Sequence, residues 1–166
     1  RAARPGVRHG HGAGAAEDGD PDALAESIEV CKAIFAGETV DFTGEHYDVT
    51  GYQGFPKPVQ TPHPPLLIGG GGKRVLTLAA QQADIVGINP KIASGRVDSA
   101  TAQNGAAART DEKLAWVREA AGSRYDDIEI NMLIFAVVIT DDAEGTAEMM
   151  APLFSLDPAE VPHYPL

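Results

Sequence analysis

The chain has 166 residues, of which 43% are hydrophobic, and this is enough for one ordinary globular domain with a sizeable core. Thirteen Lys and Arg against 24 Asp and Glu give a net charge of −11, which excludes strongly anionic partners such as nucleic acid or a negatively charged membrane surface. No apolar run approaches the roughly 20 residues of a membrane span, and a single cysteine, Cys31, excludes an internal disulfide. We therefore expect a cytoplasmic protein without a membrane partner.

The first 21 residues contain no large apolar side chain except Val7. Such a segment cannot contribute to a core, so residues 1–21 are predicted to be a disordered tail and residues 22–166 the folded domain. His9 and His11 lie in a glycine-rich tract that fixes no ligand geometry, and we expect no metal site there.

A helix is predicted from residue 22 to residue 36, ending at Gly37. Its apolar residues recur at helical spacing: Leu24, Ile28, Cys31 and Phe35. Cys31 is therefore expected to be a packed core thiol and not a nucleophile.

A short hairpin is predicted next. Apolar residues alternate on both sides of Thr43-Gly44-Glu45, namely Val40, Phe42, Tyr47 and Val49. Five prolines between residues 56 and 65 then hold the chain extended.

From residue 66 onward, strands and helices alternate. Strands are predicted at 66–68, 83–88 and 132–139, and helices at 73–82, at 110–121 and after Asp141 or Asp142. The ~30-residue repeat is typical of βα units, and continuous apolar strands indicate a parallel sheet buried on both faces. Residues 93–108 are expected to be a mobile excursion after the second strand. The last helix is expected to pack on the core through a face that contains Met149, Met150, Leu153 and Phe154.

These elements predict an α/β fold, specifically a partial (β/α)8 TIM barrel of about three βα units with a preceding helix and hairpin. A complete barrel takes about 250 residues, and the predicted units account for less than half of one. The alternative is a small doubly wound sheet, for which three strands are few.

The strand at 66–68 runs into four glycines, Gly69 to Gly72, followed by Lys73 and Arg74 at the start of a helix. Glycine allows positive φ and close approach of a ligand, and backbone N–H groups at a helix N-terminus hold phosphate. The other interpretation is a tight turn that simply needs glycine. The P-loop pattern does not fit, because Leu67 stands where it requires glycine, and the dinucleotide pattern fails at Arg74 and Val75.

Several stretches together resemble the luciferase-like monooxygenase family, and in particular its members that use the deazaflavin coenzyme F420. They are Gly44-Glu45-His46-Tyr47, the run from Pro58 to Gly72, and Leu78-Ala79-Ala80 followed by Ala83-Asp84. The resemblance covers residues 22–155, and residues 1–21 depart from it. It implies a (β/α)8 barrel that transfers hydride or oxygen through a flavin-type ring. Residues 65–68, 83–88 and 130–139 would be its fifth, sixth and seventh strands, and strands one to four and eight would be absent.

The resemblance also implies a site. The cofactor phosphate would contact Gly71, Gly72, Arg74 and Val75, with Gly70 as a neighbour. The cofactor would be coenzyme F420 or FMN, and the sequence does not distinguish the two, because both present a phosphate to the same turn. Asn89 matches a substrate-binding polar position, whereas Lys91 is displaced by one from the family's lysine, whose place Ile92 holds.

No catalytic residue is identified. The sequence offers no Ser-His-Asp arrangement, no spaced metal ligands and no paired catalytic carboxylates. Asp84, His46 and His63 are expected to have structural or surface roles.

The leading hypothesis is part of a flavin- or deazaflavin-dependent oxidoreductase acting on a small molecule. Two alternatives remain: a catalytically inactive remnant that pairs with a complementary barrel half or with another copy, and an unrelated phosphate-binding α/β module.

Overall fold

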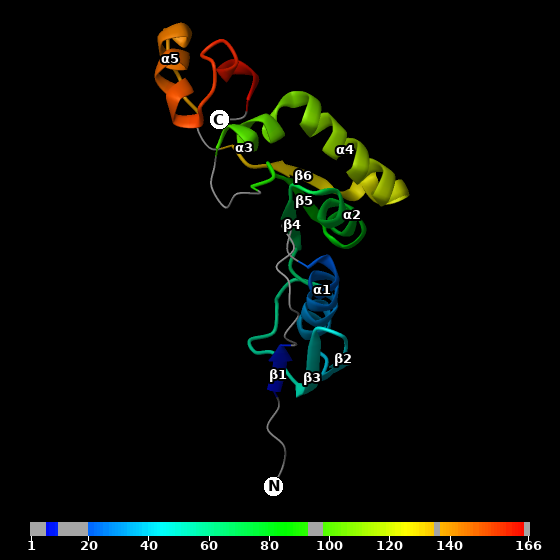
Figure 1. Cartoon of the computed structure of the whole chain (residues 1–166). Coiled ribbons are helices and arrows are strands. Elements are labelled where there is room, and N and C mark those ends of the chain that lie inside the picture. Colours follow the sequence, from blue (N-terminus) through cyan, green and yellow to red (C-terminus); the bar gives the residue numbers. More distant parts are fainter. Residues whose placement is uncertain (1–5, 10–19, 93–97, 135–136, 165–166) are drawn as a thin grey trace. The chain divides into compact units, whose positions relative to one another are not determined.

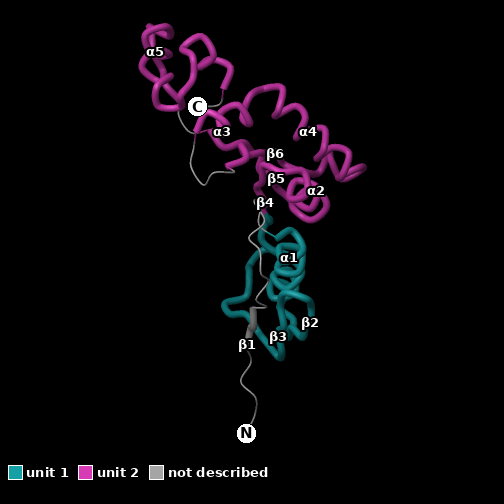
Figure 2. Tube along the Cα trace, viewed as in Figure 1, with its two compact units in different colours: residues 1–66 teal, residues 67–166 magenta. Residues whose placement is uncertain are grey.

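The computed structural model describes residues 6–9, 20–92, 98–134 and 137–164. The chain divides into two compact units, residues 1–66 and residues 67–166 (Figure 2). Each unit is described by itself.

The first unit packs one helix against an antiparallel sheet (Figure 1). Helix α1 (Pro21–Ala36) precedes the hairpin of β2 (Val40–Thr43) and β3 (Tyr47–Tyr52), so the predicted helix and hairpin are confirmed. Strand β1 (Gly6–His9) pairs with the other edge of β3, which gives the order β1-β3-β2.

Strand β1 lies within the segment that is predicted to be a disordered tail. The backbone of Gly6–His9 pairs with residues 47–50 of β3. Strand pairing uses backbone groups, so it does not need large apolar side chains. Residues 1–5 and 10–19, including His11, lie outside the described residues.

Local capping sets both ends of α1. The Asp20 side chain accepts a hydrogen bond from the Asp22 N–H at 3.0 Å, and Pro21 occupies the first helical position, where no N–H is needed. At the other end Gly37 has φ 86°, a left-handed conformation that glycine adopts without strain.

The core of this unit shows that the prediction for Cys31 was wrong. The core cluster of this unit contains Val30, Val40 and Val49, with Ala33 and Ile34 of α1 packed beside them, and Ile28 is buried as predicted. The face that α1 presents to the sheet therefore runs through residues 30, 33 and 34, and Cys31 is exposed.

The second unit contains a three-stranded parallel sheet with the order β4-β5-β6. The strands are β4 (Leu67–Gly70), β5 (Ile85–Ile88) and β6 (Glu129–Met132). The helices are α2 (Lys73–Gln82), α3 (Ser99–Gly105), α4 (Ala107–Ala121) and α5 (Ala143–Phe154), with 3-10 turns η1 (Gly122–Asp127) and η2 (Val161–His163).

Helices α2 and α4 pack together on one face of this sheet (Figure 1). The core between them and β5 includes Leu76, Val86, Ile88 and Val117, each at most 2% exposed. The alternation of strand and helix confirms the βα pattern, and α2 has its predicted bounds. Both sheets are small and open, so a closed barrel is not seen among the described residues.

The third predicted strand was placed too late. Strand β6 ends at Met132, and of the apolar run that follows, Leu133, Ile134 and residues 137–139 are exposed. Its partner β5 stops at Ile88 and leads to Pro90, which has no N–H to donate, so the ladder ends there. Burial on both faces was also wrong for β6, which is an exposed edge strand.

Two expectations for the helices were also wrong. Residues 99–108 are largely helical, because Asp98 caps α3 through the Thr101 N–H at 2.9 Å and α4 begins at Ala107; residues 93–97 lie outside the described residues. Asp142 caps α5 as predicted, but Met149 and Leu153 are 64% and 69% exposed. The buried residues of α5 are the small Ala147 and Ala151.

None of the described helices combines the length and apolar character that a bilayer-spanning segment needs.

Candidate functional site

The glycine run lies where β4 ends and α2 begins. Gly69 and Gly70 belong to β4, which differs from the predicted strand 66–68, and only Gly71 and Gly72 form the turn. Gly72 is the N-cap of α2 in extended conformation. Among the described residues, no side chain caps this N-terminus and no acidic residue occupies its first turn. The N-terminal N–H groups and the positive end of the helix dipole therefore lie next to two cationic residues, Lys73 and Arg74.

The glycines are needed for close packing and not for positive φ. The described glycines with positive φ are Gly37, Gly51 and Gly122, all outside the run. A Cβ on Gly71 would lie 2.8 Å from the backbone N and Cα of Lys91. The turn after β4 thus touches the backbone of the segment after β5, and a side chain at position 71 would force them apart.

This packing brings the predicted cofactor residues next to the predicted substrate residues. The Asn89 N–H donates to the Gly70 carbonyl at 3.0 Å, and Gly71 lies against Lys91. Both contacts are at the carboxyl ends of β4 and β5, because these strands are parallel and in register at Gly70 and Ile88.

The remaining predicted cofactor residues differ in what they can offer. Arg74 is exposed. The side chain of Val75 is buried beside Gly70, so only its backbone is available to a ligand. The Lys73 ammonium lies 5.9 Å from the ring centroid of Trp116, in a cation–π contact on α4.

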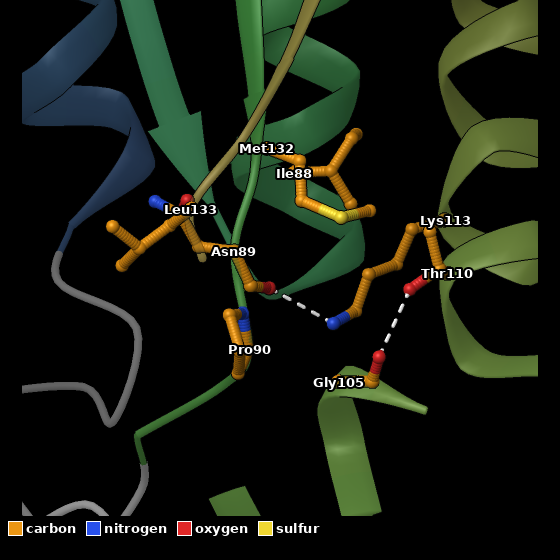
Figure 3. Close-up of a pocket in the computed structure, with 8 residues that line it drawn as sticks. All are labelled: Ile88, Asn89, Pro90, Gly105, Thr110, Lys113, Met132 and Leu133. Carbon is orange, nitrogen blue, oxygen red and sulfur yellow. Dashed lines mark hydrogen bonds between the residues drawn. The ribbon is translucent and has the colours of Figure 1, made fainter. Parts of the chain in front are cut away.

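A buried lysine that sequence analysis missed lies behind the end of β5. Lys113 on α4 is 2% exposed. Its Nζ donates to the Asn89 carbonyl at 2.9 Å (Figure 3). It also donates to the carbonyl and Oδ1 of Asn104 at 2.8 and 2.7 Å. The sequence carried a signal, since Lys113 precedes Val117 and Ala121 by four and eight residues on the apolar stripe of the predicted helix.

Burial lowers the pKa of Lys113 from 10.5 to about 8. Desolvation disfavours the ammonium form, the nearby Arg109 charge adds to this effect, and the Glu112 carboxylate opposes it. The three acceptors of Lys113 are neutral oxygens, and no carboxylate of the described residues is bonded to this buried cation.

Two adjoining pockets lie at this end of the sheet. The first is lined by Ile88, Asn89, Pro90, Gly105, Thr110, Lys113, Met132 and Leu133 (Figure 3). As the described residues frame it, this pocket leaves no room for a water molecule. The second measures about 300 Å³, shares Gly105, Thr110 and Met132 with the first, and reaches Asp111 and the C-terminal residues His163 and Tyr164. Of the predicted substrate residues, Asn89 lines the first pocket and Lys91 lines neither.

The other residues considered in the sequence make local contacts. His46 lies 3.6 Å from the Asp20 carboxylate, and the His63 ring contacts the Pro64 carbonyl at 2.9 Å. The Asp84 carbonyl accepts the Glu129 N–H where β5 and β6 begin. In the described residues, no three His, Cys, Asp or Glu side chains are placed to hold a metal ion.

Comparison with known protein families bears directly on this arrangement. The model of the family described as luciferase-like monooxygenase matches residues 5–165, which is nearly the whole chain. The match is longer than the stretch 22–155 that carried the resemblance in the sequence, and it includes most of the segment thought to depart from the family. The chain therefore belongs to the luciferase-like monooxygenase family.

Proposed function

We propose that this chain supplies the phosphate-binding turn of a flavin- or deazaflavin-dependent oxidoreductase. Its family consists of oxidoreductases that use a flavin or coenzyme F420. The proposed cofactor is FMN or coenzyme F420, and the proposed phosphate contacts are Gly70, Gly71, Gly72, Arg74 and the backbone of Val75. When bound, the ring system of the cofactor supplies the redox chemistry.

The uncapped N-terminus of α2 is the observation that carries this proposal. The turn Gly71–Gly72 has no side chain, the first helical turn has no acid, and Arg74 is exposed beside it. Backbone N–H groups and a guanidinium are the donors that phosphate prefers. The residues present therefore fit a phosphate group.

The location supports the same proposal. In (β/α)8 enzymes the active site lies at the carboxyl ends of the strands. The turn, Asn89 and Lys91 lie at that end of β4 and β5. We propose that β4, β5 and β6 are the fifth, sixth and seventh strands of such a barrel, and that Asn89 and Lys91 face a small-molecule substrate.

A titration tests the proposal. The chain is titrated with FMN and with coenzyme F420, and binding is followed by cofactor fluorescence, with inorganic phosphate as competitor. We expect saturable binding of one cofactor, weakened by phosphate. Arg74→Ala should reduce the affinity by roughly 1.5–3 kcal/mol, the range for a hydrogen bond to a charged group.

Lys73→Ala is the matched control, because it removes the same charge one residue away. The proposal assigns the phosphate contact to Arg74 and not to Lys73, so this variant should lose much less affinity. Equal losses in both variants would show that overall charge, and not an Arg74 contact, favours the anion. No binding of either cofactor would overturn the proposed function.

A further inference from the structure

Lys113 is buried in an unusual way. The residue is 2% exposed, and among the described residues the three acceptors of its ammonium belong to Asn89 and Asn104. A buried charge without a bonded carboxylate is costly, and its hydrogen bonds are what compensate. The three hydrogen bonds are therefore what keeps the Lys113 ammonium in this buried position.

These bonds fasten the backbone that follows β5. Lys113 holds the Asn89 carbonyl directly. It also holds Asn104 of α3 through two atoms, and the same Asn104 Oδ1 accepts the Lys91 N–H at 2.6 Å. One ammonium on α4 thus fixes both ends of the segment 89–91, once directly and once through Asn104.

The segment 89–91 is the part of the molecule that touches the glycine turn. The Asn89 N–H bonds to the Gly70 carbonyl, and the Lys91 backbone lies against Gly71. A shift of this segment would therefore displace Asn89 and Lys91 from the turn.

We propose that Lys113 is a positioning residue that, through Asn89 and Asn104, holds residues 89–91 in register with the turn Gly70–Gly71. The backbone part of this proposal is independent of any ligand. The effect on binding rests on the proposed function.

Direct ligand binding by Lys113 is not the role that the geometry supports. Its three N–H groups are already used, and the pocket that it lines has no room for a water molecule among the described residues. Lys113 acts on the turn through the backbone that it holds.

Amide hydrogen exchange of the whole chain, read by NMR, tests the backbone part. Lys113→Met keeps the length of the side chain and removes its donors. Arg118→Met is the matched control, since it removes a cation from the exposed face of the same helix. We expect Lys113→Met to lose at least tenfold protection at the Lys91 amide, with the Val86 and Val117 amides nearly unchanged. Unchanged protection at Lys91, or equal loss at all three amides, would overturn the proposal.

A measurement on the unmodified chain covers the case in which Lys113→Met does not fold. Deprotonation of Lys113 leaves two N–H groups for three acceptors, so the amide signals of Lys91 and Asn104 should shift with the midpoint at which Lys113 titrates. Among the described residues, the charged groups that act on Lys113 are Arg109 and Glu112, which pair with each other at 2.6 Å. Signals of Lys91 and Asn104 that do not move with Lys113 would also overturn the proposal.

Cofactor titration of the same variants separates this proposal from the proposed function. If the unmodified chain binds FMN or coenzyme F420, Lys113→Met should bind at least fivefold more weakly and Arg118→Met equally well. Equal affinity in all three would overturn the link between Lys113 and the turn. If the unmodified chain binds neither cofactor, the proposed function fails, and the exchange data alone decide whether Lys113 positions residues 89–91.

Discussion

The stability of the second unit should rise with pH above about 8, because of Lys113. In the folded chain, burial lowers the pKa of this residue from 10.5 to about 8. Between these values the unfolded chain binds a proton that the folded chain does not, so the free energy of unfolding increases with pH. Below pH 8 both states are protonated, and the cost of burying the ammonium is constant.

The size of the effect follows from the span of the two pKa values. One pKa unit corresponds to roughly 1.4 kcal/mol. The difference between 10.5 and about 8 therefore gives at most about 3–4 kcal/mol, gained progressively between these two pH values.

Urea unfolding between pH 7 and pH 10.5 measures this effect. The single tryptophan, Trp116, packs against the core of the second unit and reports its unfolding by fluorescence. Tyrosine and cysteine titrate in the same range, so the informative quantity is the difference between the unmodified chain and Lys113→Met at each pH. That difference should grow with pH in favour of the unmodified chain. Parallel stability curves for the two proteins would refute the reasoning.

Two further predictions concern packing and the hairpin. Leu76→Ala should destabilise the second unit by about 2–5 kcal/mol, because removal of this fully buried side chain leaves a cavity. Leu153 is exposed, so Leu153→Ala should change stability by less than about 0.5 kcal/mol. Urea unfolding followed by tryptophan fluorescence checks both variants, and a large loss in Leu153→Ala would contradict the surface position of α5. In the first unit, burial raises the pKa of Glu26. The carboxylate accepts hydrogen bonds from three backbone N–H groups, however, and these bonds hold the pKa below its ordinary value of 4.5. These hydrogen bonds should therefore hold the hairpin fully above pH 4.5, and the hairpin should loosen as pH falls through the lowered pKa of Glu26. Glu26→Gln should loosen the hairpin at neutral pH, whereas Glu29→Gln should not. Amide exchange of residues 45–47 measures this, and equal exchange in the two variants would count against the contact between Glu26 and the hairpin.

Local signals in the sequence predicted the helices and strands whose ends are marked by capping or turn residues. Asp20, Pro21 and Gly37 fix the ends of α1 through contacts within a few residues, and the alternation around Gly44 predicts the hairpin. The bounds of α2 follow from the glycines before it and the apolar stripe within it. These features depend on neighbours in the chain, and so they can be read without the fold.

Which face of each helix is buried, and where the last strand ends, could not be predicted in this way. Cys31 and Met149 have helical spacing typical of a core, yet both are exposed because the face that each helix buries is set by the element it packs against. Strand β6 ends at Met132 because its partner β5 ends, although the apolar run continues. The positions of the partners, and not hydrophobicity, decided these cases.

The candidate site shows the same division. The sequence by itself predicted a turn at the glycine run and the start of α2, because both are marked by residue type at a strand or helix end. The positions Asn89 and Lys91 came from the resemblance to the family. Only the tertiary structure decided that position 71 needs glycine, because the backbone of Lys91 packs against it. It also decided that Lys113 bonds to Asn89, which lies 24 residues earlier in the chain. The residue types and their spacing mark a turn at Gly71 and place Lys113 on an apolar stripe. They do not reveal the distant backbone that each contacts, because those partners come within reach only in the folded chain.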